Sequence, residues 1–142
     1  MTIAMTPLLT ERDHAILVGL FRQGGLHTAT YLQQLHEKLQ TAEVVPLEEV
    51  EPDLATFGSF VRYRVNEGRS MEHKLALHPR RGQEQHTISI RTARGLALLG
   101  MREGQVFTAR QSQDVHESIE IEMIMFQPEA DGEQLRPEAF GS

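Results

Sequence analysis

The first part of the chain repeats its hydrophobic residues at helical spacing. Thr10-Glu11-Arg12-Asp13 has the form of a capping box, in which the threonine hydroxyl accepts a hydrogen bond from the third amide and the acid reaches back. A broad apolar face follows over residues 15–21. Gly24-Gly25 ends it, because glycine readily takes the left-handed geometry that follows a helix. The pattern predicts one helix between these two signals.

Three leucines predict a second helix. Leu32, Leu35 and Leu39 are spaced three and then four residues apart, which places them on one stripe. Only residues 23–28 separate the two helices, so they are expected to be antiparallel neighbours whose stripes pack against each other. Residues 1–43 are therefore predicted to form a short helical hairpin, or coiled coil. The hairpin needs support from the rest of the protein, because isolated helices of this length are marginal in water.

The hydrophobic period changes after a proline-containing acidic stretch. Residues 43–56, EVVPLEEVEPDLAT, hold two prolines and five acids without a sustained period, which predicts a linker over 44–56. Beyond it, apolar and polar residues alternate as in half-buried strands, with turn residues between the runs. Strands are predicted over 60–65, 74–78, 86–90, 106–110 and 118–126.

One apolar segment interrupts the strands. Residues 95–100, GLALLG, directly follow a strand pattern and are typical of a short turn of helix closed by glycine. The hairpin, the five strands and this short helix predict an α+β fold with a mostly antiparallel five-stranded sheet over 57–127. Residues 128–142 are expected to be a polar, acidic and loosely held tail.

The net charge of −6 is unevenly spread. Residues 1–59 carry three basic and eight acidic side chains, residues 60–110 carry ten and four, and residues 111–142 carry one and eight. The favoured interpretation is ion pairing across antiparallel strands. The alternative is a basic patch for an acidic partner. An acidic total with few aromatic residues does not favour nucleic-acid binding, so no direct sequence-specific contact with nucleic acid is expected.

Composition excludes several kinds of site. Without cysteine the chain has no disulfide, thiolate metal site or thiol nucleophile. The seven histidines lack metal-ligand spacing and are interpreted as surface residues, and no serine-based catalytic motif is present. We therefore expect no catalytic residue, metal or cofactor. No apolar run is long enough to cross a bilayer and no signal peptide is recognisable, so a soluble cytoplasmic protein is expected.

Two weaker signals in the sequence have structural explanations. Arg94 to Gly100 places glycine where a strand passes into a helix, a geometry in which free amides can hold a phosphate, but the full nucleotide-binding motifs are absent. A prolyl isomerase would need an aromatic-lined pocket, whereas most aromatic residues of the sheet region are expected to be needed for the core. Those residues are Phe57, Phe60, Tyr63, Phe107 and Phe126.

Several separated motifs, taken in order, resemble the C-terminal domain of the Gre transcript-cleavage factors, the GreA/GreB family. The resemblance covers about residues 50 to 133, and the closing FQPEADGE together with the short hairpin looks most like the Rnk branch, the regulators of nucleoside diphosphate kinase. The motifs are Phe57-Gly58-Ser59-Phe60-Val61, Ile88-Ser89-Ile90, Gly95-Leu96-Ala97-Leu98-Leu99-Gly100, Glu103-Gly104 and Phe126-Gln127-Pro128-Glu129-Ala130-Asp131-Gly132-Glu133.

The resemblance implies an FKBP-like sheet domain without isomerase activity, which docks on bacterial RNA polymerase at the rim of its secondary channel. It implies a polymerase-docking segment made of Arg91, Thr92, Ala93, Arg94 and Gly95. It also implies that this segment is anchored from the core by Leu96, Leu98 and Leu99. The family usually has Ser-Pro where this chain has Thr92-Ala93, and losing the proline removes a fixed φ angle.

In Gre factors a long coiled coil enters the channel and presents acidic residues that hold magnesium. Here the hairpin tip, Gln23, Gly24, Gly25, Leu26 and His27 with its flanking residues, has no carboxylate, and magnesium requires oxygen ligands. The expected function is thus a non-enzymatic regulator that binds polymerase, competes with Gre-type factors, lacks transcript cleavage and is linked to nucleoside diphosphate kinase. The alternative is a nucleotide-responsive or adaptor protein that uses the Arg91 to Gly100 turn for a different partner.

Overall fold

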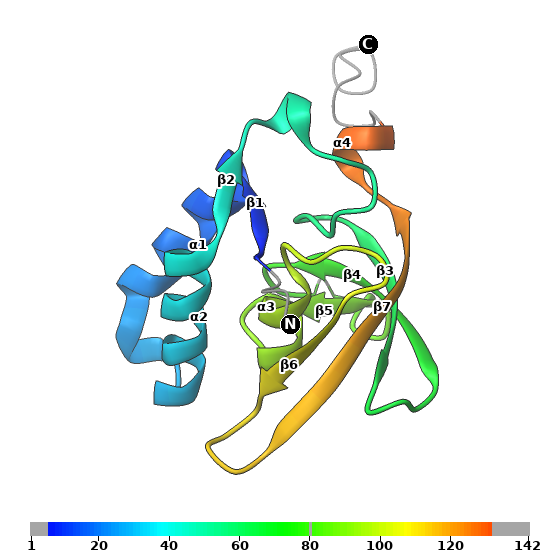
Figure 1. The fold of residues 1–142 in the computed structure, drawn as a ribbon. Coiled ribbons are helices and arrows are strands. Elements are labelled where there is room, and N and C mark those ends of the chain that lie inside the picture. The colour runs from blue at the N-terminus through cyan, green and yellow to red at the C-terminus, as the bar shows by residue number, and fades with distance from the viewer. Residues whose placement is uncertain (1–5, 80, 132–142) are drawn as a thin grey trace, which may run out of the picture.

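The computed structural model describes residues 6–79 and 81–131. A helical hairpin lies along one side of a twisted sheet, and a short helix, α3, is packed between the two (Figure 1). In chain order the first elements are β1 (Leu8–Thr10), α1 (Glu11–Gln23), the 3-10 turn η1 (Gly24–Leu26), α2 (Ala29–Thr41), β2 (Glu43–Val45) and the 3-10 turn η2 (Leu47–Glu49).

The second half of the chain forms a five-stranded sheet with the order β5-β4-β3-β7-β6. The pair β4–β5 is parallel and the other neighbours are antiparallel, which confirms the predicted α+β fold with a mostly antiparallel sheet. Its elements are β3 (Phe60–Val65), β4 (Ser70–Ala76), β5 (Thr87–Ser89), α3 (Ala93–Leu98), β6 (Val106–Arg110), β7 (His116–Phe126) and α4 (Pro128–Asp131).

The first helix begins and ends where its capping residues predict. Thr10 Oγ1 accepts from the Asp13 amide at 3.0 Å, and Gly24, with φ of 30°, follows the last residue of α1. The second half of the predicted capping box is wrong. The Asp13 carboxylate turns toward residue 57 and accepts from the Phe57 amide at 3.0 Å, so it joins α1 to the segment that precedes β3.

Two short strands close the open end of the hairpin and were not predicted. β1 and β2 pair in parallel, with Leu9 opposite Val44, and so hold the segment before α1 against the segment after α2. The predicted linker also contributes to the core, since Leu54 and Ala55 are both 1% exposed. Of the predicted tail, residues 128–131 form α4 rather than loose chain, and residues 132–142 lie outside the described part.

A single hydrophobic core extends from the hairpin into the sheet. Leu17 and Leu35 from the two helices belong to the same buried cluster as Tyr63, Leu98 and Ile119. The hairpin therefore gains from the sheet the support that its short helices require. The largest fully buried side chains are Leu9, Leu17, Leu35, Leu54, Tyr63, Leu75, Ile90, Leu96, Leu98, Leu99, Ile119 and Ile121.

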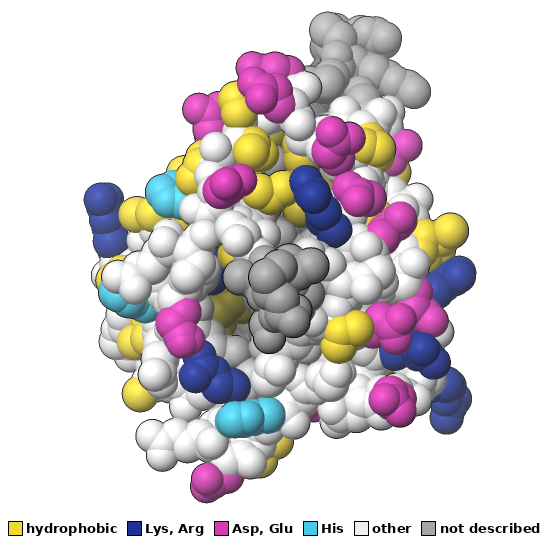
Figure 2. Space-filling view, viewed as in Figure 1, with side chains coloured by type: hydrophobic (Ala, Val, Ile, Leu, Met, Phe, Trp, Pro, Cys, Tyr) yellow, Lys and Arg dark blue, Asp and Glu magenta, His cyan; other side chains and the backbone are white. Residues whose placement is uncertain are grey.

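Ion pairs across strands explain much of the uneven charge. Arg64 on β3 contacts both Glu120 and Glu122 on β7, and Arg62 pairs with Glu72 on β4. This confirms the favoured interpretation of the charge pattern. On the face shown in Figure 2, Lys and Arg side chains are dispersed among Asp and Glu, and acidic side chains gather at the upper end, over η2.

Candidate functional site

The predicted docking segment, residues 91–95, is held in place by short side-chain hydrogen bonds. Ser89, the last residue of β5, donates from Oγ to the Leu77 carbonyl at 2.5 Å and accepts at the same atom from the Arg91 amide at 3.0 Å. Ser89 thus fixes the point at which the chain leaves the sheet and turns toward α3.

Hydrogen bonds of the Thr92 side chain hold this turn in place of the rigidity that a proline would give. Its Oγ1 accepts from the Gly95 amide at 3.1 Å as the N-cap of α3, and the same hydroxyl donates to the Ser89 carbonyl at 2.6 Å. One side chain therefore ties both ends of the turn together. The Gly95 amide, which could have faced a phosphate, is already engaged by this cap.

Gly95 is required by a close approach between two pieces of backbone. A Cβ atom added at this residue would lie 2.0 Å from the Ser89 carbonyl oxygen and 3.0 Å from the Ile90 Cα. Any other residue would push α3 away from the end of β5. The three predicted anchors complete the attachment, because Leu96, Leu98 and Leu99 are at most 1% exposed.

Arg94 is engaged in a bidentate ion pair. Its Nε and Nη2 donate to the two oxygens of Glu117 on β7 at 2.8 and 2.7 Å. These hydrogen bonds hold the pKa of Glu117 below its ordinary value and raise that of Arg94. Gln111 donates to the same carboxylate at 2.9 Å. A partner that used Arg94 would have to compete with Glu117, whereas Arg91 has no such acidic partner among the described residues.

The hairpin tip and the docking segment contact each other, although Gln23 and Arg91 are 68 residues apart in the sequence. Arg91 Nη2 donates to Gln23 Oε1 at 3.2 Å. Tyr31, on the first turn of α2, donates from its hydroxyl to the Ile90 carbonyl at 2.6 Å and stacks on the His27 ring at 4.8 Å between centroids. Burial raises the pKa of Tyr31 to about 12, so the hydroxyl keeps its proton at neutral pH.

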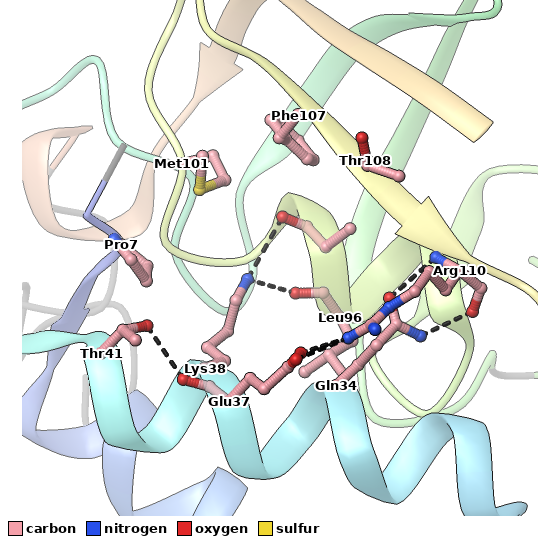
Figure 3. A pocket seen from close by; sticks show the side chains of 11 residues that line it. Pro7, Gln34, Glu37, Lys38, Thr41, Leu96, Met101, Phe107, Thr108 and Arg110 are labelled. Carbon is pink, nitrogen blue, oxygen red and sulfur yellow. Dashed lines mark hydrogen bonds and ion pairs between the residues drawn. The ribbon is translucent and has the colours of Figure 1, made fainter. Parts of the chain in front are cut away.

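A second contact from α2 holds the backbone that directly follows the docking segment. Lys38 reaches from α2 to the C-terminal end of α3, where its Nζ donates to the carbonyls of Leu96 at 2.5 Å and of Ala97 at 3.2 Å (Figure 3). The same Nζ also donates to the Leu99 carbonyl. A cation at this end also complements the helix dipole. Burial lowers the pKa of Lys38 to about 7, whereas hydrogen bonds from an ammonium group to carbonyl oxygens in general favour its charged form.

Gln34 lies between these two contacts on the same helix. Its side-chain amide exchanges two hydrogen bonds with the backbone of Arg110 on β6, at 2.6 and 2.8 Å. Tyr31, Gln34 and Lys38 are spaced three and then four residues apart, so one stripe of α2 faces the docking segment and β6. The sequence prediction missed these residues. The sequence does contain a signal for them, because these three residues form a second stripe at helical spacing beside the leucine stripe of the same helix.

The tip residues, 23–27, include no carboxylate side chain. Gln23 and Gly25 are exposed, Gly24 turns the chain with a positive φ, and His27 is half-buried against Tyr31, while Leu26 ends η1. In residues 6–79 and 81–131 no group of three or more His, Asp or Glu side chains lies close enough to hold a metal ion. The same residues include no helix that is both long and apolar enough to span a bilayer.

Comparison with solved structures identifies the fold. The prokaryotic transcription elongation factor GreA/GreB from Nitrosomonas europaea matches with a TM-score of 0.64 and 24% identity, over 87% of this chain and 100% of that one. GreA factor homolog 1 (Gfh1) of Thermus thermophilus matches with a TM-score of 0.42 and 15% identity, over 85% of this chain and 99% of that one. Thermus aquaticus Gfh1 matches with a TM-score of 0.43 and 17% identity, over 85% of this chain and 99% of that one. No family model and no curated protein matches the sequence.

Proposed function

We propose that this protein is a non-enzymatic regulator that docks on bacterial RNA polymerase through one composite surface, made of residues 91–95 and the hairpin tip. The observation that carries the proposal is the Arg91–Gln23 hydrogen bond, which makes the docking segment and the tip adjacent parts of one surface. Tyr31 and Lys38 add to it, because they hold the backbone on both sides of the segment. A docking surface fixed in this way loses little conformational entropy on binding.

The fold and the sequence motifs support the choice of partner. The matched structure with the higher TM-score is named as a transcription elongation factor, and its whole length is covered by this chain. Two of the motifs that resemble the GreA/GreB family flank the docking segment, since Ile88-Ser89-Ile90 precedes it and Gly95 to Gly100 begins with its last residue. The finer assignment, to the Rnk branch and to regulation of nucleoside diphosphate kinase, rests on the short hairpin and the FQPEADGE motif.

The chemistry of the tip supports binding without transcript cleavage. Magnesium takes oxygen ligands, usually including carboxylates, and residues 22–28 supply no carboxylate. A protein that occupies the secondary channel without such ligands excludes Gre-type factors but cannot assemble their catalytic ion. The function we propose is therefore competition with these factors in the cytoplasm, with no reaction catalysed by this chain.

Binding to purified core polymerase at low salt, with and without a competing Gre factor, tests the proposal. We expect the wild type to bind and to be displaced by the Gre factor, and Arg91→Glu to weaken binding at least about tenfold, or about 1.4 kcal/mol. Arg69→Glu is the matched control, because Arg69 is exposed and lies on the β3–β4 turn. The proposal is refuted if the wild type does not bind, or if both variants bind equally well.

A cleavage assay separates regulation from catalysis. We expect no shortening of nascent RNA in backtracked complexes, under conditions in which a Gre factor shortens it. Isothermal titration calorimetry with nucleoside di- and triphosphates tests the alternative function, and submicromolar to micromolar binding would favour it over polymerase docking.

A further inference from the structure

Two adjoining cavities lie at the end of the sheet where β3 begins and β7 ends. One has a volume of about 400 Å³ and the other about 500 Å³, and both are lined by Gly58 and Lys74. A Cβ atom at Gly58 would lie 3.0 Å from Pro128 Cγ, so the glycine lets the Pro128 ring pack closely beside the backbone that the two cavities share. We call this continuous feature the Lys74 groove. None of the docking segment, residues 91–95, lines it.

Aromatic side chains and a methionine line the groove, although aromatic residues make up only 6% of the protein. Phe60, Phe126 and Met125 line the first cavity and Phe57 lines the second, so three of the six phenylalanines lie there. Phe57 also packs against the core, but Phe60 and Phe126 belong neither to the core nor to its partly buried margin. Met125 is 41% exposed. Apolar surface that is left open to water in this way marks interaction sites.

The charges of the groove have one sign. Among the described residues that line it are the cations Arg12 and Lys74 together with His78, and none of these described lining residues is Asp or Glu. Arg12 is engaged by Glu129 at 2.7 Å, but within the described part of the chain Lys74 has no ion pair and is exposed. A partner that places a carboxylate beside Lys74 would therefore form a new pair without breaking an existing one.

We propose that the Lys74 groove binds an acidic peptide segment of a partner protein, with one bulky apolar side chain seated between Phe60, Met125 and Phe126. The apolar side chain contributes affinity because its surface is removed from water against these three side chains. Carboxylates that flank it approach Lys74 and set the direction of the segment. An acidic peptide is favoured over nucleic acid because a phosphate backbone is bound by a row of cations, whereas Arg12 is already paired and, of the Lys and Arg residues described as lining the groove, Lys74 alone lacks an ion pair.

The test is fluorescence anisotropy with full-length protein and a short fluorescein-labelled peptide, in which one phenylalanine is flanked by aspartates and glutamates. Lys74→Glu is expected to weaken binding about tenfold and Met125→Gln severalfold, and added salt should weaken it further. Arg69→Glu and Val106→Gln are matched controls, exposed residues outside the groove, that should bind like the wild type. Far-UV circular dichroism verifies that each variant is folded.

Other outcomes overturn the assignment. Equal binding of a peptide with lysines in place of the acids, or unchanged binding by Lys74→Glu and Met125→Gln, would mean that the groove does not select an acidic segment. Tighter binding of a single-stranded oligonucleotide that Lys74→Glu abolishes would assign the groove to nucleic acid. A dimer in sedimentation analysis that Met125→Gln dissociates would assign it to a second copy of the chain. Polymerase binding by Lys74→Glu is measured in parallel, and its retention separates this groove from the docking surface.

Discussion

Gly95→Ala is the substitution for which the structure makes the sharpest forecast. The added methyl group would meet the Ser89 carbonyl oxygen at 2.0 Å, which is far inside van der Waals contact. The carbonyl oxygen is part of the backbone and the added Cβ is bonded directly to the Gly95 backbone, and hydrogen bonds hold the backbone at both residues. No side-chain rotation can relieve the overlap, so α3 or the end of β5 has to move.

The expected cost follows from two opposing effects. Overpacking of a close contact costs about 1–3 kcal/mol and occasionally more, and a contact between backbone groups belongs at the upper end of that range. Replacing glycine by alanine within a helix returns about 1 kcal/mol. Gly95→Ala should therefore lower the free energy of unfolding by about 2 kcal/mol or more. It should also weaken polymerase docking, because the segment from Arg91 to Gly95 is displaced.

Gly19→Ala provides the matched control. Gly19 is an exposed residue inside α1 with no atom within 4 Å of an added Cβ, so the same substitution should stabilise by about 0.5–1 kcal/mol. Urea unfolding followed by circular dichroism at 222 nm measures both, which suits a chain without tryptophan. If the two variants shift the unfolding midpoint in the same direction, the steric argument for Gly95 is wrong.

Three further substitutions test the docking segment and its supports. Thr92→Ala removes the N-cap and should destabilise by about 1 kcal/mol in urea unfolding, whereas an unchanged midpoint would dismiss the dual role of its hydroxyl. Ala93→Pro should stabilise by about 0.4–1 kcal/mol, because Ala93 is the first residue of α3 and Thr92, at φ −97° and ψ 159°, already has a conformation allowed before proline; a loss of stability would contradict this. The third is Lys38→Met. Lys38 has a folded pKa of about 7 against an ordinary 10.5, so the unfolded chain binds more protons between these values, and stability rises with pH. Between pH 7 and 10 the free energy of unfolding of the wild type should rise relative to that of Lys38→Met by at most about 4 kcal/mol. If the difference between the two free energies of unfolding does not change with pH, the carbonyls keep the lysine charged.

Local signals in the sequence were sufficient for most elements. Thr10 and Gly24 bound α1 because capping depends on residues close in sequence, and alternation gave the bounds of β3 and β6 as the structure has them. β4 begins at Ser70, four residues earlier than predicted. Its polar start is recruited by antiparallel pairing with β3, where Met71 lies opposite Tyr63, and local alternation does not record that pairing.

The features that were missed depend on contacts between distant segments. β1 and β2 have three residues each and become strands only because the hairpin brings them together. Asp13 satisfied the capping-box pattern, yet its carboxylate binds the Phe57 amide, a contact that no spacing rule contains. The candidate site shows the same division. The change from strand to short helix could be predicted from the local sequence, although α3 begins at Ala93 and not at Gly95, whereas its attachment to Tyr31 and Lys38 required the packed structure.

Gln34 has a consequence for how the protein behaves at high concentration. β6 is the last strand of its sheet, and strands in that position expose free amide and carbonyl groups that recruit further chains into fibrils. The carboxamide of Gln34 occupies both backbone groups of Arg110, as a peptide unit of another strand would. Helix α2 therefore shields this border of the sheet from self-assembly.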